Sequence, residues 1–243
     1  MQTPIGSVSV MGIRENLAMV RERIGRAALR AGRDPAGVSL VAVTKTLSVG
    51  LIREALSCGL TDFGENYAQE FRDKRRELEG ERNSGGGEIK WHFIGVLQSN
   101  KVKYLVGRVE LIHSLDAVNA AAEIDKRSRE RGIATPVLIE VNLTGDPKRG
   151  GVLEEEIRDF LSKVAGMRGV SVRGLMTMPP YAGNPEEGRP YFRRLREIRD
   201  RYSPEYSGLV ELSMGMSGDY EVAIEEGATY VRIGSAIFGP RPY

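Results

Sequence analysis

The sequence has very few of the side chains that form cross-links and metal sites. Its 243 residues include a single cysteine, so no disulfide can form within the chain and a reducing, cytoplasmic location is expected. That cysteine, Cys58, lies in the helical pattern LIREALSCG and is interpreted as a small core residue. Two histidines cannot build a His₃ zinc site, and no metal-ligand spacing such as H-E-x-x-H occurs. A catalytic metal is therefore not expected.

Long apolar runs and a strong excess of one charge are also missing. No stretch approaches the roughly 20 apolar residues that a membrane helix needs. The 35 basic and 33 acidic residues leave a net charge of +2, which by itself indicates neither a nucleic-acid nor a membrane partner. Glu15 and Glu22 interrupt the arginines near the start of the chain, so neither a signal peptide nor an organellar transit peptide is expected.

The sequence does contain a regular alternation of short apolar runs and helical patterns. The spacing of Ile13, Leu17, Val20 and Ile24 predicts a helix within residues 1–35, and the Gly32 to Pro35 segment should end it. About eight strand-like runs then alternate with helices, the pattern of a (β/α)8 TIM-like barrel of roughly 250 residues. We predict an α/β fold of this kind, a single domain over residues 1–243 with an extra N-terminal helix.

An open, doubly wound sheet is the structural alternative to the barrel. It is disfavoured because no G-x-G-x-x-G fingerprint follows the first strand. The glycine-rich segment GERNSGGGE at 80–88 lacks the lysine and hydroxyl spacing of a phosphate loop, and it is predicted to be a flexible surface loop.

In such a barrel the chemistry collects where the strands end, because the loops after the strands converge on one face. The residues that end or follow the expected strands are Lys45, Glu65, Asn66, His92, Asp116, Asn142, Met176, Ser217, Gly234 and Ser235. Several of these residues are amides, hydroxyls or glycines, which hold ligands by hydrogen bonds. His113, inside an apolar run, is instead expected to be a hydrogen-bonded interior group.

Ser217 and the Gly234-Ser235 pair follow the last two expected strands, where barrel proteins frequently bind a phosphate group through backbone N–H groups. The alternative is that Ser217 or Asp219 only caps the helix that follows.

Lys45 ends the first expected strand and Arg232 lies inside the last one. A lysine held beside a phosphate site can form a Schiff base with an aldehyde, whereas the alternative is a solvated surface amine. A buried guanidinium needs a partner, and an ion pair with Glu140 or Glu211 is the structural alternative to a ligand contact.

Several longer segments resemble the pyridoxal phosphate (PLP) homeostasis proteins, single-barrel relatives of the N-terminal domain of alanine racemase. The matching segments are VAVTK (41–45), FGENYAQE (63–70), WHFIGVLQSNK (91–101), SLD (114–116), VLIEVN (137–142), RGLMTM (173–178), LSMGMSGDYEVAI (212–224) and VRIGSAIFG (231–239). They follow one another over almost the whole chain.

The resemblance implies that PLP is the cofactor and assigns a role to each matching residue. It implies a Schiff base on Lys45 and a contact between Arg232 and the pyridine nitrogen. Ser217, Gly234 and Ser235 would hold the phosphate group. Asn66 would line the ring near its phenolic oxygen with Met216 nearby, and His92 is a further pocket candidate.

Three features depart from the family pattern. The segment NLTGDPKRGG differs from the acid-rich loop that the family usually shows, so no role follows for Lys148. Thr44 stands where serine is common, and the 80–88 segment resembles a local insertion.

The pattern leaves three hypotheses about function. The first is a non-enzymatic carrier that buffers PLP and supplies apo-enzymes, acting as a monomer without nucleic-acid or membrane partners. The second is a PLP-dependent amino-acid racemase of low activity, which is disfavoured because the chain ends at FGPRPY without a further domain to supply a second base. The third is a nucleic-acid or protein-interaction module built on the arginine-rich helix at 189–202, where Glu197 and Asp200 interrupt the basic run.

Overall fold

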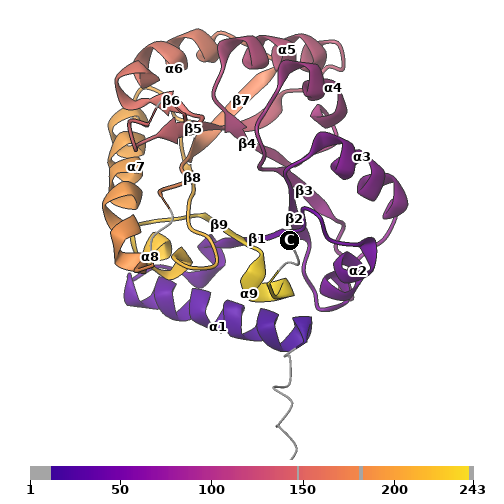
Figure 1. The fold of residues 1–243 in the computed structure, drawn as a ribbon. Coiled ribbons are helices and arrows are strands. Elements are labelled where there is room, and N and C mark those ends of the chain that lie inside the picture. Colours follow the sequence, from indigo (N-terminus) through magenta and orange to yellow (C-terminus); the bar gives the residue numbers. More distant parts are fainter. Residues whose placement is uncertain (1–11, 147, 181–182, 241–243) are drawn as a thin grey trace, which may run out of the picture.

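Parallel strands close into a ring in the computed structural model, and the helices lie around the outside of that ring (Figure 1). The structure describes residues 12–146, 148–180 and 183–240. The strands are β1 (Ser39–Val43), β2 (Asp62–Glu65), β3 (Lys90–Phe93), β4 (Leu111–Leu115), β5 (Thr135–Asn142), β6 (Val152–Leu153), β7 (Val170–Met176), β8 (Glu211–Ser213) and β9 (Tyr230–Ile233).

Helices separate most of these strands along the chain. The α-helices are α1 (Ile13–Arg30), α2 (Val49–Ser57), α3 (Ala68–Glu77), α4 (Val102–Leu105), α5 (Val118–Arg129), α6 (Ile157–Ala165), α7 (Arg189–Tyr202), α8 (Tyr220–Glu225) and α9 (Ser235–Phe238). Short 3-10 helices span η1 (Pro35–Gly37), η2 (Ser99–Lys101), η3 (Glu154–Glu156) and η4 (Pro185–Gly188). Within the described ranges, no helix has the length and apolar character needed to cross a membrane.

The order of the strands confirms the predicted barrel and excludes the open sheet. The pairing runs β4-β3-β2-β1-β9-β8-β7-β5, and β5 also pairs with β4, so the ring of eight strands closes on itself. The two-residue strand β6 adds to β5 outside this ring. All these pairs are parallel, so every strand of the ring ends on the same face of the barrel.

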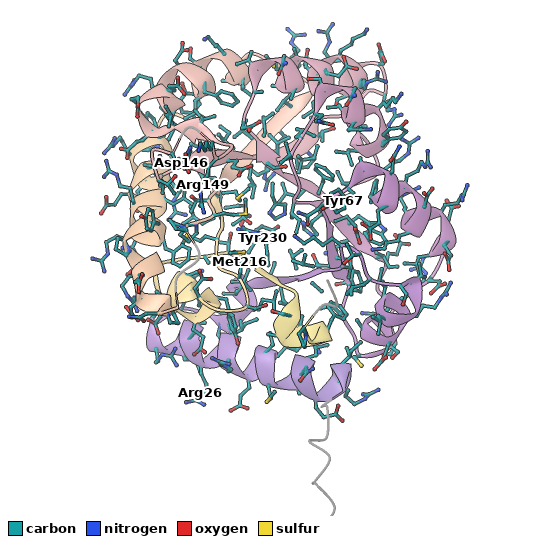
Figure 2. The ribbon with its side chains drawn as sticks, in the orientation of Figure 1. Arg26, Tyr67, Asp146, Arg149, Met216 and Tyr230 are labelled. Atoms are coloured by element: carbon teal, nitrogen blue, oxygen red, sulfur yellow. The ribbon has the colours of Figure 1, made fainter. Side chains whose placement is uncertain are left out.

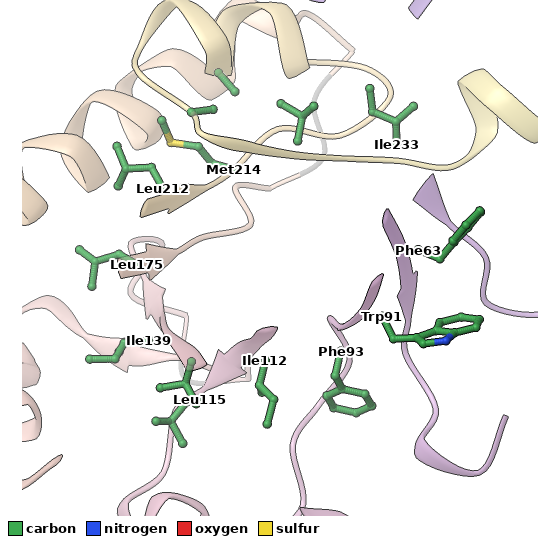
Figure 3. Packing of buried hydrophobic residues seen from close by; sticks show 14 of the residues in the cluster. Phe63, Trp91, Phe93, Ile112, Leu115, Ile139, Leu175, Leu212, Met214 and Ile233 are labelled. Carbon is green, nitrogen blue, oxygen red and sulfur yellow. The ribbon is translucent and has the colours of Figure 1, made fainter. Parts of the chain in front are cut away.

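Side chains alternate between the two surfaces of the ring, as the pleat of a strand requires. The outward side chains of β3, β7 and β8, such as Trp91, Leu175 and Leu212, are buried in the large apolar layer under the helices (Figure 3). A smaller apolar cluster of Leu111, Leu138 and Met176 is separate from that layer. Much of the remaining barrel interior is polar, with His92, His113, Ser213 and Arg232 among its buried side chains.

The predicted N-terminal helix is confirmed from Ile13 to Arg30; residues 1–11 of the predicted segment lie outside the described residues. Gly32 has a φ of +65°, a left-handed conformation that favours glycine and ends the helix. Leu17 is buried where α1 packs against α8 and α9 (Figure 1). Arg30 adds ion pairs to Glu221 and Glu225 of α8.

The glycine-rich segment at 80–88 folds back on itself. Arg82 and Glu88 form an isolated antiparallel bridge and an ion pair. Asn83 Oδ1 accepts the N–H groups of Gly85 and Gly87. The segment is thus a hydrogen-bonded turn at the surface, and its flexibility stays a prediction.

The arginines of α7 are engaged in ion pairs with the barrel's own acids. Arg189, Arg193 and Arg196 all pair with Glu226, whose side chain is only 6% exposed. Arg194 pairs with Glu154. These contacts explain the basic run as an internal ion-pair network, which leaves little reason to propose a nucleic-acid surface on this helix.

Replacing Leu17 with alanine should lower the free energy of unfolding by about 2–5 kcal/mol, because the side chain is buried and the cavity would not refill. The matched control is Met19→Ala on the same helix, where the side chain is 46% exposed and the loss should stay within about 0.5 kcal/mol. Urea unfolding followed by circular dichroism measures both values, and similar losses for the two variants would contradict the packing of α1.

Candidate functional site

A cavity of about 670 Å³ opens at the carboxyl ends of β1, β7, β8 and β9. This volume lies within the range of roughly 300–1,000 Å³ that is common for small-molecule sites. Its lining consists of Val43, Lys45, Pro180, Asn184, Pro185, Gly188, Met216, Ser217, Gly218, Asp219, Arg232, Gly234, Ser235 and Pro240. In Figure 2, Met216 and Tyr230 lie within the ring of strands, whereas Arg26 of α1 points away from it.

The cavity brings together most of the residues that the sequence predicts for the site. Those are Lys45, Met216, Ser217, Arg232, Gly234 and Ser235. Asn66 and His92 do not line it. The sequence reasoning named no residue of the segment after β7, although Asn184, Pro185 and Gly188 form one wall. The rule that loops after strands carry the site would have pointed to this segment.

A buried cluster of charges holds the backbone on both sides of Lys45. Lys74 Nζ donates to Glu65 Oε1 at 2.8 Å, to Glu70 Oε1 at 2.7 Å and to the carbonyl of Thr44 at 2.6 Å. Its side chain is 7% exposed and that of Glu65 is fully buried. Because each ammonium hydrogen has an acceptor, the buried lysine is compensated.

The same cluster holds an unfavourable backbone conformation directly after Lys45. Thr46 has a φ of +64°, and for a β-branched residue this costs on the order of 1–3 kcal/mol. Its N–H donates to Glu70 Oε1 at 2.6 Å, and Lys74 fixes that same carboxylate oxygen. These two hydrogen bonds fix the backbone next to Lys45, whose side chain is half-buried and lines the cavity.

Two neighbouring side chains at the end of β2 carry buried acceptors. Glu65 Oε2 and Asn66 Oδ1 contact no hydrogen-bond donor in the described part of the chain. Burial raises the pKa of Glu65 above its ordinary value, against the effect of Lys74 and Thr44. A Cβ on Gly95 would lie 2.0 Å from the carbonyl oxygen of Asn66, so only glycine lets the WHFIG segment approach Asn66 this closely.

Arg232 lies in the interior of the barrel below the cavity and is 4% exposed. Its Nη1 donates to Ser213 Oγ at 2.5 Å and its Nη2 donates to the carbonyl of Thr177 at 3.1 Å. Burial lowers the pKa of Arg232 to about 10, with nearby Glu140 and Asp219 opposing that change. The alternative of an ion pair with Glu140 or Glu211 is not found among the described residues, where the guanidinium donates to a hydroxyl and a carbonyl instead.

The loops after β8 and β9 are joined through Ser217. Its Oγ accepts the N–H groups of Gly234 and Ala236, each at 3.3 Å. Asp219 Oδ1 accepts the N–H of Met216 at 2.6 Å, and neither side chain caps α8. The capping alternative is therefore wrong, and the hydroxyl and amide groups of the two loops converge on the cavity.

His92 is a correction to the predicted set of pocket residues. Its side chain is fully buried inside the barrel, and both ring nitrogens have protein partners: His113 at 3.0 Å and Asp62 at 3.1 Å. Because both nitrogens are engaged away from the cavity, no direct contact of His92 with a ligand is proposed. His113 is hydrogen-bonded in the interior, as predicted.

The polar side chains of the cavity are an amine, a guanidinium, two hydroxyls and the amide of Asn184, together with the carboxylate of Asp219, which accepts the N–H of Met216. This set fits an anionic ligand with an electrophilic carbonyl. In the described ranges, no cluster of His, Cys, Asp or Glu is arranged to hold a metal ion.

The fold and the cavity define a barrel of the alanine racemase N-terminal domain class, and that family matches residues 12–242. A racemase from Corynebacterium glutamicum has the same fold, with a TM-score of 0.64 and 16% identity over 96% of this chain and 64% of that one.

Full-length relatives give the particular family. A pyridoxal phosphate homeostasis protein of Aquifex aeolicus is 50% identical over 230 residues, 94% of this chain and 98% of that protein. PipY of Synechococcus elongatus, solved with PLP bound, has a TM-score of 0.80 and 33% identity, covering 93% of this chain and all of that one. The chain belongs to the pyridoxal phosphate homeostasis protein family.

Replacing Glu140 with glutamine should remove a pH dependence of stability. Burial, with the charge of Asp116, raises the pKa of Glu140 from 4.5 to about 7. The folded state therefore binds the proton more tightly than the unfolded state, so this residue stabilises the fold below about pH 4.5 and loses that contribution as the pH rises through about 7.

Urea unfolding of both proteins at pH 5 and pH 8, without added ligand, measures this effect. The wild-type protein should lose on the order of 3 kcal/mol relative to Glu140→Gln over that range. Parallel pH profiles of the two proteins would show that Glu140 does not titrate in this range.

Proposed function

We propose that this protein binds PLP in the cavity at the carboxyl ends of the strands and maintains the supply of this cofactor as a carrier and buffer. The observation that carries the proposal is the meeting of Lys45, Arg232 and the Ser217 loop in one cavity. The homeostasis proteins related to this chain, and PipY with PLP bound, support it.

When bound, PLP supplies a phosphate group, a pyridine nitrogen and an aldehyde, and the aldehyde can condense with an uncharged amine. We assign Lys45 Nζ as the amine, because it is half-buried at the cavity and its backbone is held on both sides by the Glu65, Glu70 and Lys74 cluster. It is the uncharged form of such an amine that attacks carbonyls.

The remaining residues would bind the two ends of the cofactor. Ser217 and Ser235 would offer hydroxyl donors to the phosphate where the loops after β8 and β9 meet, beside Gly234, whose N–H donates to Ser217 Oγ. Met216 would pack on the ring. Asn66, whose buried Oδ1 contacts no donor in the described part of the chain, would meet the polar substituent of the ring.

Arg232 would lower the reactivity of the bound cofactor, although an arginine at this place does not by itself exclude racemisation. A guanidinium is always charged and only donates hydrogen bonds, so it favours an unprotonated pyridine nitrogen. An unprotonated ring withdraws electrons weakly, which disfavours cleavage at the α-carbon of an amino acid. We further propose that apo-enzymes receive the cofactor and that the chain acts as a cytoplasmic monomer.

Replacing Lys45 with alanine should abolish covalent attachment of PLP. Borohydride treatment of the loaded wild-type protein should fix the cofactor to a peptide that contains Lys45, and the visible absorption should disappear on reduction. The matched control is Lys103→Ala, at an exposed position of α4, which should behave as wild type. An unchanged spectrum for Lys45→Ala would refute the assignment of the amine.

The holo-protein should not racemise amino acids at ordinary enzymatic rates of about 1–10³ per second. A two-base racemase needs a second base on the far side of the substrate, and the described lining residues include no histidine or tyrosine. Incubation with single enantiomers followed by chiral chromatography tests this. Turnover in that range would favour the racemase over the carrier.

A further inference from the structure

The two histidines of the chain lie in one row of hydrogen bonds through the barrel interior. Asp62 Oδ1 is 3.1 Å from His92 Nε2, and His92 Nδ1 is 3.0 Å from His113 Nε2. His113 Nδ1 is 2.8 Å from Ser213 Oγ, which is the acceptor of Arg232. The row therefore connects a carboxylate at the start of β2 with the guanidinium below the cavity.

When both imidazoles are neutral, the two ends of this row determine the direction of every hydrogen bond. An ionised Asp62 can only accept, so His92 must donate from Nε2. The Nδ1 of neutral His92 is then an acceptor, which requires His113 to donate from its Nε2. Nδ1 of His113 must accept in turn, so the hydroxyl hydrogen of Ser213 points to it. The lone pairs of Ser213 are thereby left for Arg232, which can only donate.

We propose that Asp62, His92, His113 and Ser213 form an ordered hydrogen-bond chain that positions Arg232 and offsets its buried charge. The two imidazoles are neutral with their protons on Nε2, and Asp62 sets this arrangement from the opposite end of the barrel. These four residues act as positioning residues, because none of them lines the cavity.

The surroundings of the chain favour this arrangement. His92 and His113 are fully buried, and the ring of Tyr230 packs at 5.7 Å and 5.5 Å from their centroids. Burial, with the charge of Arg232 acting in the same direction, holds the pKa of His113 well below its ordinary value. Burial opposes ionisation of Asp62, but hydrogen bonds from His92 and Thr61 outweigh it and lower its pKa.

The chain also connects two surfaces of the molecule. Asp62 has a side chain that is 21% exposed, and it lies at the amino end of β2, whereas the cavity opens at the carboxyl ends. A change at Asp62 can therefore act on the cavity without touching a ligand. Its expected effect on cofactor binding depends on the proposed function, whereas the protonation of the imidazoles does not.

The proton positions can be read directly in the protein without cofactor. Because the chain has two histidines, a long-range ¹H–¹⁵N spectrum of ¹⁵N-histidine-labelled protein at pH 7 contains only two imidazoles. Each should show a bare Nδ1 and a protonated Nε2. A proton on Nδ1 of either ring, or a doubly protonated ring, would overturn the proposal.

Asp62→Asn tests whether the carboxylate imposes the order. An amide can donate as well as accept, so the whole chain can reverse, and the His113 ring should show a mixture of tautomers although it does not contact position 62. Asp73→Asn, at a side chain that is 51% exposed on α3, is the matched control and should leave both rings unchanged. An unchanged His113 in Asp62→Asn would refute the ordering.

PLP affinity measures the effect on Arg232. Asp62→Asn should weaken binding about two- to tenfold, the value of one weakened hydrogen bond, and Asp73→Asn should not. Equal affinities of wild type and Asp62→Asn would refute the positioning role. If wild-type protein does not bind PLP at all, the proposed function fails, while the imidazole spectra still decide whether the ordered chain exists.

Discussion

The charge of Arg232 inside a closed barrel is the constraint on which the site depends. A guanidinium that is 4% exposed needs acceptors, because an unpaired buried charge costs several kcal/mol. Within the described part of the chain, the fold supplies no carboxylate in direct contact. It supplies a hydroxyl and a carbonyl, and the hydroxyl leads through two imidazoles to Asp62. The remaining donors of the guanidinium stay available at the floor of the cavity.

A second buried charge shapes the opposite wall. Lys74 is compensated by two glutamates and a carbonyl, and through Glu70 it holds Thr46 in a left-handed conformation. Lys45 lies between the two backbone positions that this cluster holds. Lys45 and Arg232 are thus each positioned by groups that do not line the cavity, a common way to fix the geometry of a site.

Sequence reasoning was effective where local pattern and strand order decide the outcome. The alternation of apolar runs predicted the closed ring, because eight parallel units with covering helices close in this way. The rule that strand ends carry chemistry predicted Lys45, Ser217 and Gly234. The same rule wrongly predicted His92 as a pocket residue, because His92 lies within β3 and its ring is buried in the interior. It did not find the segment around Asn184, because an irregular loop has no periodic signal.

The sequence by itself determined the fold class, the family and the residue types of the site, since these depend on periodicity and on motifs that are local in the chain. Only the tertiary structure decided which polar groups meet. Asp62, His113 and Ser213 are widely separated in sequence, and their contacts arise because closure brings the inner surfaces of different strands together. The hydrogen-bond partners of Arg232, and the Glu65, Glu70 and Lys74 cluster beside Lys45, depend on how side chains point across the ring. A linear pattern contains no information on those directions.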